Sequence, residues 1–212
     1  MVIEGGRVVS VGDADAALPA GERAADLDGR LLLPALVNAH DVLDACTLPP
    51  LGRPPYPNLY RWIEDAAREG TQHADAMRPS LADRLLLGGL RNLLAGVAAV
   101  VHHEADHRSL ARDDFPVRVQ RRYGFAHSPG LVEKLRQTYR TTDRRIPWFV
   151  RAAAGVDEGA RGETLRLAEA NVLRQNTVVV HGTALGADDV RRLAEAGACV
   201  VWCPEIDERL FA

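Results

Sequence analysis

Apolar residues follow two different patterns along most of the chain. Short apolar runs, typical of strands buried on both faces, cover residues 31–38, 97–103, 117–128, 147–155, 176–183 and 198–204. Segments with apolar residues at helical spacing lie between them, at residues 58–70, 79–96, 130–140, 157–173 and 186–198. Strands that alternate with helices predict a parallel sheet. The predicted fold class is therefore α/β, an incomplete (β/α)8 TIM-like barrel with a small N-terminal β segment.

The first 30 residues have a different pattern. Two short β-rich runs flank Gly5-Gly6, which is a hairpin signal, and Asp28-Gly29 marks another turn. We therefore expect two domains, a small N-terminal β segment over residues 1–30 and a partial barrel over residues 31–212.

Composition excludes several classes of function. The chain has 212 residues, of which 47% are hydrophobic, so it can bury a sizeable core. A net charge of -3 argues against a nucleic-acid-binding protein, which would need a clustered basic face. The sequence has neither a signal peptide at its N-terminus nor an apolar run long enough to span a membrane, so we expect a cytoplasmic protein.

The three cysteines do not resemble a disulfide framework. Cys199 and Cys203 are four residues apart, a spacing that puts both thiols on one face of a strand. They are interpreted as small core residues, with a structural zinc pair as the alternative.

Histidines stand at the ends of several predicted strands. In a parallel barrel, the carboxyl ends of the strands meet at one rim, and the chemistry is found there. A lone histidine at a strand end is usually structural, whereas a group of them on one rim indicates a functional site. The candidates at this rim are His40, His102, His103, His127 and His181, with Arg151 inside the fourth strand.

Several motifs resemble those of the amidohydrolase superfamily, in particular cytosine deaminases and chlorohydrolases. "LLLPALVNAHDVL" is similar to the opening motif, an apolar strand that ends in Asn-Ala-His-x-His. "WFVRAAAGVDEGARGE" resembles the strand that normally carries His-x-x-Glu-Gly, and "NTVVVHGTALGADDVRRLAEAGACVVWCPEID" resembles the His-Gly strand and the Cys-Pro strand after it. The resemblance implies a barrel that holds a divalent metal, most often zinc, which activates water to hydrolyse non-peptide C–N bonds.

On this resemblance, His40 and His181 match metal ligands, but other positions depart from the family. Val42 replaces the second histidine of the opening motif, and Arg151 replaces another metal-binding histidine. Ala154 stands where the family has its proton-shuttling Glu, and the last strand, with its metal-binding Asp, is expected to be missing. Valine cannot bind a metal, and a guanidinium repels one.

Three interpretations of the site follow. The leading one is an amidohydrolase-like protein with an eroded and truncated catalytic site that lacks the family's usual metal chemistry. The alternative is a ligand-binding or regulatory pseudoenzyme, in which Arg151 and His127, with His40 and His181, hold a small anionic molecule. The third is a working hydrolase with a rebuilt metal site that adds His103 or His127 to His40 and His181, using loop residues such as Glu104 and Asp106.

The sequence does not indicate a substrate beyond a small molecule. Because an incomplete barrel leaves sheet edges open, which are prone to pair with other chains, we expect a homo-oligomer, most simply a dimer.

Overall fold

The computed structural model describes residues 1–13, 21, 23–127 and 132–212, which divide into two compact units, Met1–Pro34 and Ala35–Ala212. In the first unit, β1 (Val2–Glu4) and β2 (Arg7–Ser10) pair antiparallel around Gly5-Gly6, so the predicted hairpin is confirmed. Asp28 and Gly29 both have positive φ, 49° and 71°, and the Arg30 N–H donates to the Leu27 carbonyl, which closes the second predicted turn.

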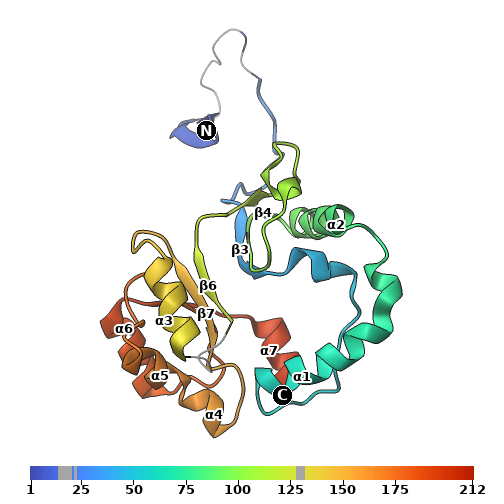
Figure 1. Cartoon of the computed structure of the whole chain (residues 1–212). Coiled ribbons are helices and arrows are strands. Elements are labelled where there is room, and N and C mark those ends of the chain that lie inside the picture. Colours follow the sequence, from blue (N-terminus) through green and yellow to red (C-terminus); the bar gives the residue numbers. More distant parts are fainter. Residues whose placement is uncertain (14–20, 22, 128–131) are drawn as a thin grey trace. The chain divides into compact units, whose positions relative to one another are not determined.

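Parallel strands form two sheets in the second unit (Figure 1). The first sheet contains, in order, β3 (Leu36–Asp41), β4 (Val97–His102) and β5 (Arg118–Val119). The second contains β6 (Gly124–Ala126), β7 (Trp148–Ala152), β8 (Thr177–His181) and β9 (Cys199–Val201). Every pairing within these two sheets is parallel, which confirms the predicted α/β class.

The structure corrects the extent of three predicted strands. The segment predicted as one strand over residues 117–128 is two strands, because β5 pairs with β4 whereas β6 pairs with β7. Ser128 lies outside the described residues. The strand predicted over 31–38 begins at Leu36 and continues to Asp41, and the strand predicted over 198–204 ends at Val201.

The helices agree more closely with their predicted ranges. They are α1 (Leu59–Gly70), α2 (Leu81–Leu94), α3 (Val132–Thr141), α4 (Glu158–Arg161), α5 (Glu163–Glu169), α6 (Ala187–Ala196) and α7 (Pro204–Phe211). Short 3-10 helices are η1 (Leu43–Thr47), η2 (Thr71–Met77) and η3 (Arg108–Ala111). The helix predicted over 157–173 is broken at Gly162, and α7 was not predicted. Residues 130 and 131 of the predicted third helix lie outside the described residues.

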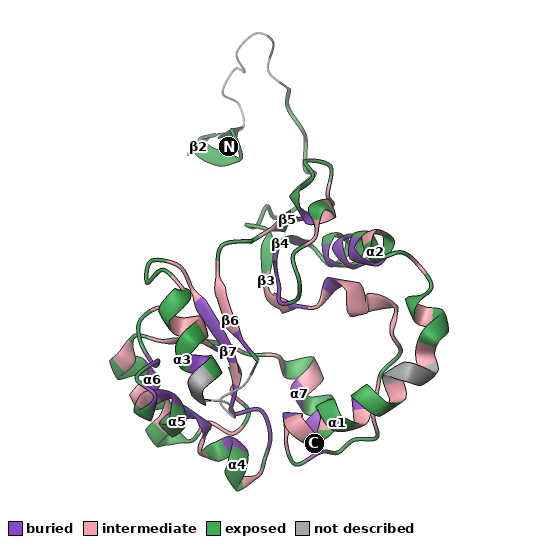
Figure 2. Ribbon diagram, viewed as in Figure 1, coloured by how far each residue is buried: buried purple, intermediate pink, exposed green. Residues whose placement is uncertain are grey.

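Strand β7 of the second sheet is mostly buried (Figure 2), and its alternate residues pack on opposite faces of the sheet. Trp148 and Val150 of β7 and Val179 of β8 pack with residues of α3, α5 and α6, which lie along one face. Phe149 and Val180 pack instead with Val101 of β4, so they face the first sheet. The side between the two sheets is therefore the inner side of the partial barrel, and residues there are candidates for a site.

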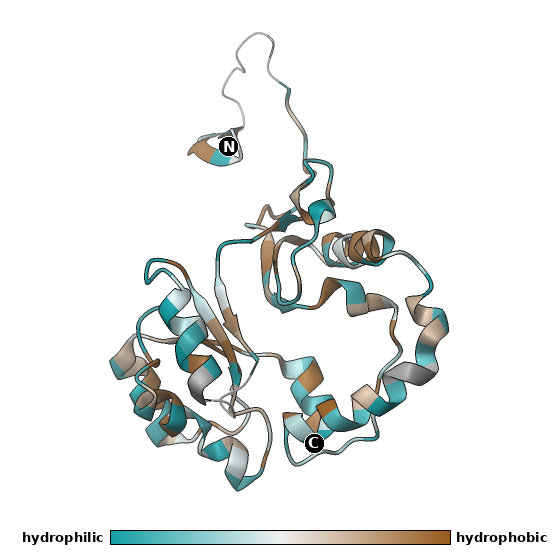
Figure 3. Ribbon diagram, viewed as in Figure 1, coloured by the Kyte–Doolittle hydropathy of each residue, from teal (hydrophilic) through white to brown (hydrophobic). Residues whose placement is uncertain are grey.

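Apolar surface remains exposed in the second unit. Helix α2 is rich in apolar residues (Figure 3). Its Leu90 and Leu94 are 39% and 88% exposed, and other leucines of this helix are also exposed. Leu36 and Val37 of β3, at the edge of the first sheet, are 60% and 66% exposed. In the described parts of the chain, no helix is both long and apolar enough to cross a lipid bilayer.

Candidate functional site

Three histidines from three strands meet on the inner side. His40 lies near the end of β3, His103 directly follows β4, and His181 ends β8. The Nδ1 atoms of His40 and His103 are 3.1 Å apart, which is hydrogen-bond distance, and the ring centroids of His40 and His181 are 5.7 Å apart. The candidates His40 and His181 are therefore neighbours, and His103 joins them. We call these three residues the histidine cluster.

Burial keeps two imidazoles of the cluster neutral. Loss of solvent lowers the pKa of His103 to about 3, and the positive charge of Arg151 contributes to this shift. The pKa of His40 falls to about 2, again mainly through burial, with smaller effects from His103 and Arg151. Phe125 and Phe149 surround His103 with their rings at 4.6 and 4.8 Å between centroids, which accounts for its apolar environment.

His181 is held by a residue that the sequence did not single out. Its Nδ1 lies 2.7 Å from Oδ1 of Asp207, and both side chains are 4% exposed. Asp207 belongs to α7, the helix that was not predicted. Strict alternation along β8 would place His181 on the outer face with Val179, but a φ of 80° at His181 interrupts the extended backbone. Such a backbone conformation is uncommon at a non-glycine residue.

Arg151 lies on the inner face of β7, two residues after Phe149. Its guanidinium carbon is 5.4 Å from the centroid of the Phe125 ring. Burial lowers the pKa of Arg151, which Glu104 and Cys203 partly oppose. Among the described residues, Nε of Arg151 is buried without a hydrogen-bond partner, and no carboxylate lies within ion-pair distance. A fixed positive charge thus stands beside His40 and His103.

The other expected candidates lie apart from the cluster. His127 is exposed and contacts the Phe125 ring at 4.8 Å between centroids. His102, on the opposite side of β4 from His103, accepts a hydrogen bond from the Leu43 N–H. Asp106 forms an ion pair with Arg121.

Asp41 does not replace the metal ligand that is missing at Val42, and Ala154 cannot transfer protons as the family's Glu does. Asp41 accepts hydrogen bonds from the side chains of Asn38 and Asn92 at 2.9 and 2.7 Å, so it is held against α2 and cannot replace the ligand lost at Val42. Ala154 is buried in an apolar cluster with residues of α1 and α7.

These residues do not fit a divalent metal. Within the described parts of the chain, no three His, Cys, Asp or Glu side chains are placed to hold one. The Nδ1 atoms of His40 and His103 face each other at 3.1 Å, so neither of these two nitrogens is free for a metal. The guanidinium of Arg151 offers no lone pair. The described residues also place no further ligand beside Cys199 and Cys203, the alternative zinc pair, and both are free cysteines.

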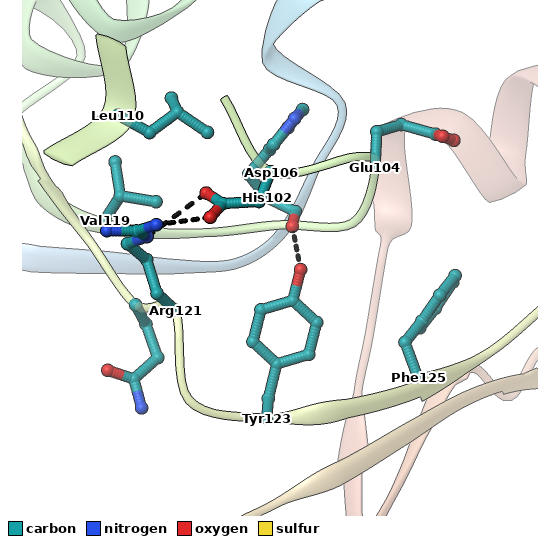
Figure 4. Close-up of a pocket in the computed structure, with 9 residues that line it drawn as sticks. His102, Glu104, Asp106, Leu110, Val119, Arg121, Tyr123 and Phe125 are labelled. Atoms are coloured by element: carbon teal, nitrogen blue, oxygen red, sulfur yellow. Dashed lines mark hydrogen bonds and ion pairs between the residues drawn. The ribbon is translucent and has the colours of Figure 1, made fainter. Parts of the chain in front are cut away.

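A cavity of about 480 Å³ opens beside the cluster (Figure 4). It lies where the chain passes from β5 to β6, and its walls include Glu104, Asp106, Arg121, Tyr123 and Phe125. Sequence reasoning missed this cavity, because it forms only where the predicted third strand divides.

Comparisons with known proteins identify the fold. No family model matches the chain, and no curated protein sequence matches it. Among solved structures, a zinc-bound adenosine deaminase from Xanthomonas campestris matches with a TM-score of 0.59 and 18% identity, over 84% of this chain and 51% of that chain. The fold is an amidohydrolase fold.

A second amidohydrolase-fold structure supports the same conclusion. A mutant atrazine chlorohydrolase from Arthrobacter aurescens TC1, in complex with zinc and atraton, matches with a TM-score of 0.56 and 14% identity, over 84% of this chain and 55% of that chain. The chain spans about half the length of these two proteins, which agrees with the predicted incomplete barrel. The resemblance found in the sequence motifs is thus confirmed at the level of the fold.

Proposed function

We propose that this chain is an amidohydrolase-fold protein in which the metal-dependent site for C–N hydrolysis is eroded. The observation that carries the proposal is Arg151. Burial is the main cause of the low pKa of His40 and His103, and the positive charge of the Arg151 guanidinium lowers the pKa of both imidazoles further. A divalent cation bound to the same imidazoles would face this fixed charge at short range in a poorly solvated site, where repulsion is strong.

A hydrolysis assay tests the loss of activity. The protein is incubated with zinc and a panel of amides and aminated heterocycles, beside a double variant, His40→Ala with His181→Ala. We expect the wild type and the double variant to give the same background rate. Zinc-dependent turnover that disappears in the double variant would overturn the proposal and favour the rebuilt metal site.

A second candidate function is the binding of a small anion by Arg151. Nε of Arg151 is buried and has no partner among the described residues, and a buried polar atom of this kind normally has one. Guanidinium matches the geometry of carboxylate and phosphate, which it binds with two parallel hydrogen bonds. The neutral imidazoles of His40 and His103 do not add charge, and only the ring that accepts in the hydrogen bond between their Nδ1 atoms has an N–H left to offer.

Calorimetric titration with acetate and with inorganic phosphate tests this second function. Arg151→Gln should weaken binding at least tenfold, because it removes the only charge-assisted donor that the proposal uses. Arg140→Gln, an exposed position on α3, is the matched control and should bind as the wild type does. Equal affinities of Arg151→Gln and wild type would contradict anion binding at this residue.

We also propose that a second copy of the chain covers exposed apolar surface at β3. An edge strand with exposed Leu36 and Val37 can pair with another chain, and natural proteins usually protect such edges. Light scattering at micromolar concentration tests this, because a monomer there would contradict it.

A further inference from the structure

The cavity beside the cluster is formed by a break in the barrel wall. β5 extends the first sheet, where the Gln120 N–H still donates to the Val100 carbonyl of β4, and β6 begins the second sheet. Residues 121–123 run between the two sheets. A continuous strand at this position would join the two sheets. The gap instead leaves a cavity of about 480 Å³, which is within the usual range for a small-molecule site (Figure 4).

Two aromatic rings in the wall of the cavity are held in place by their neighbours. The Tyr123 hydroxyl donates to the carbonyl of His102, and the Tyr123 ring is stacked on His103 with centroids 5.4 Å apart. Phe125 is fixed by its edge contacts with His103 and by the Arg151 guanidinium. Rings fixed in this way offer a flat ligand a preformed apolar surface, so little ordering is needed on binding.

The charges around the cavity favour a cation. Arg121 is paired with Asp106 through two hydrogen bonds, so these two side chains largely cancel each other. Glu104 is exposed and makes no hydrogen bond or ion pair among the described residues. Burial raises the pKa of Tyr123, and the nearby carboxylates of Asp106 and Glu104 raise it further. Arg151 acts on Glu104, but it is not among the residues that line the cavity.

We propose that this cavity binds a flat organic cation, such as an amidinium, a guanidinium or a protonated aminoheterocycle. The positive group bonds to the Glu104 carboxylate, which gives a charge-assisted hydrogen bond. The planar part of the ligand lies against Tyr123 and Phe125, whose rings attract cations through their faces. The proposal does not require a metal, and it does not depend on the histidine cluster or on anion binding by Arg151.

The test uses three probes that share a phenyl ring and differ in charge. Benzamidine carries a positive charge, benzoate a negative one, and benzyl alcohol none. Calorimetric titration of the full chain should give the order benzamidine, benzyl alcohol, benzoate, with benzamidine at least tenfold tighter than benzoate. Failure of benzamidine to bind at millimolar concentration, or tighter binding of benzoate, would overturn the proposal.

Variants then assign the site. Glu104→Gln keeps the shape of an exposed side chain and should weaken benzamidine binding about tenfold, without affecting benzyl alcohol. Glu195→Gln, an exposed carboxylate on α6, is the matched control and should bind as the wild type does. Phe125→Leu should weaken both benzamidine and benzyl alcohol, since it removes the ring. If Glu104→Gln and Glu195→Gln bind benzamidine equally, the cation does not contact Glu104 and the proposal is wrong.

Discussion

Replacement of His103 by phenylalanine should change how the stability of the protein depends on pH. His103 is 1% exposed and lies among the rings of Tyr123, Phe125 and Phe149, so a phenylalanine of similar size fits the same surroundings. The substitution removes the titrating group and the hydrogen bond to His40, which is worth about 1 kcal/mol. The variant should therefore be somewhat less stable at pH 7 but lose less stability in acid.

The size of the effect follows from the two protonation equilibria. In the folded state the pKa of His103 is about 3, so the imidazole stays neutral from pH 7 to pH 5. In the unfolded state its pKa is about 6.5, so the unfolded chain takes up a proton over the same interval. The stabilising contribution is thus fully present above pH 6.5 and is lost as the pH falls toward 3. Between pH 7 and pH 5, His103 accounts for a loss of about 2 kcal/mol in the free energy of unfolding.

Urea unfolding followed by circular dichroism at pH 7 and pH 5 measures this difference. The fall in unfolding free energy should be about 2 kcal/mol smaller in His103→Phe than in the wild type. Phe149→Leu changes the packing beside His103 without removing a titrating group, so it should lower stability equally at both pH values. If His103→Phe and the wild type lose the same stability between pH 7 and pH 5, His103 is not held neutral in the fold, and the reasoning is refuted.

Two further substitutions test contacts that shape the site. Asp207→Ala should lower the unfolding free energy by about 1–3 kcal/mol, because it leaves the buried Nδ1 of His181 without its partner. Urea unfolding measures this loss. Glu205→Ala, at an exposed position in the same helix, is the control and should leave the unfolding free energy nearly unchanged. Gly88→Ala should cost about 1–3 kcal/mol, since the new Cβ would stand 2.2 Å from the Leu43 carbonyl oxygen and push α2 away from η1. A thermal melt of Gly88→Ala that matches the wild type would show that this close approach does not exist.

Much of the second unit could be predicted because its local and tertiary signals agree. The strands β4, β7 and β8 are short apolar runs, and each is buried as its composition indicates. Helix α2 begins after Ser80, whose side chain accepts from the Asp83 N–H, so the local capping signal and the structure coincide. The family motifs ordered these elements correctly and led to the right fold.

The remaining differences have tertiary causes. The residues over 117–128 have strand composition throughout, but sequence pattern does not show that β5 and β6 belong to different sheets. The segment from Pro204 forms a helix that packs Leu210 and Phe211 against Tyr56 and Leu59, a contact between distant parts of the chain that local pattern does not reveal.

In the candidate site too, local sequence motifs predict some residues, whereas contacts between distant parts of the chain determine the others. His40 and His181 were identified from motifs, but their partners depend on contacts across the fold. Because successive strand residues face opposite sides, alternation along β4 could have shown that only one of His102 and His103 faces the inner side. The contact of Asp207 with His181 depends on how helix α7 packs, which the sequence pattern does not show.

Metal content per chain, measured by plasma mass spectrometry, tests the central claim most directly. The protein is purified without chelators or a histidine tag, incubated with zinc and desalted. The account predicts no stoichiometric metal, because the described residues do not assemble three donors and Arg151 opposes a cation. About one zinc, iron or manganese per chain, lost in His40→Ala and in His181→Ala, would contradict it and show that the site was rebuilt.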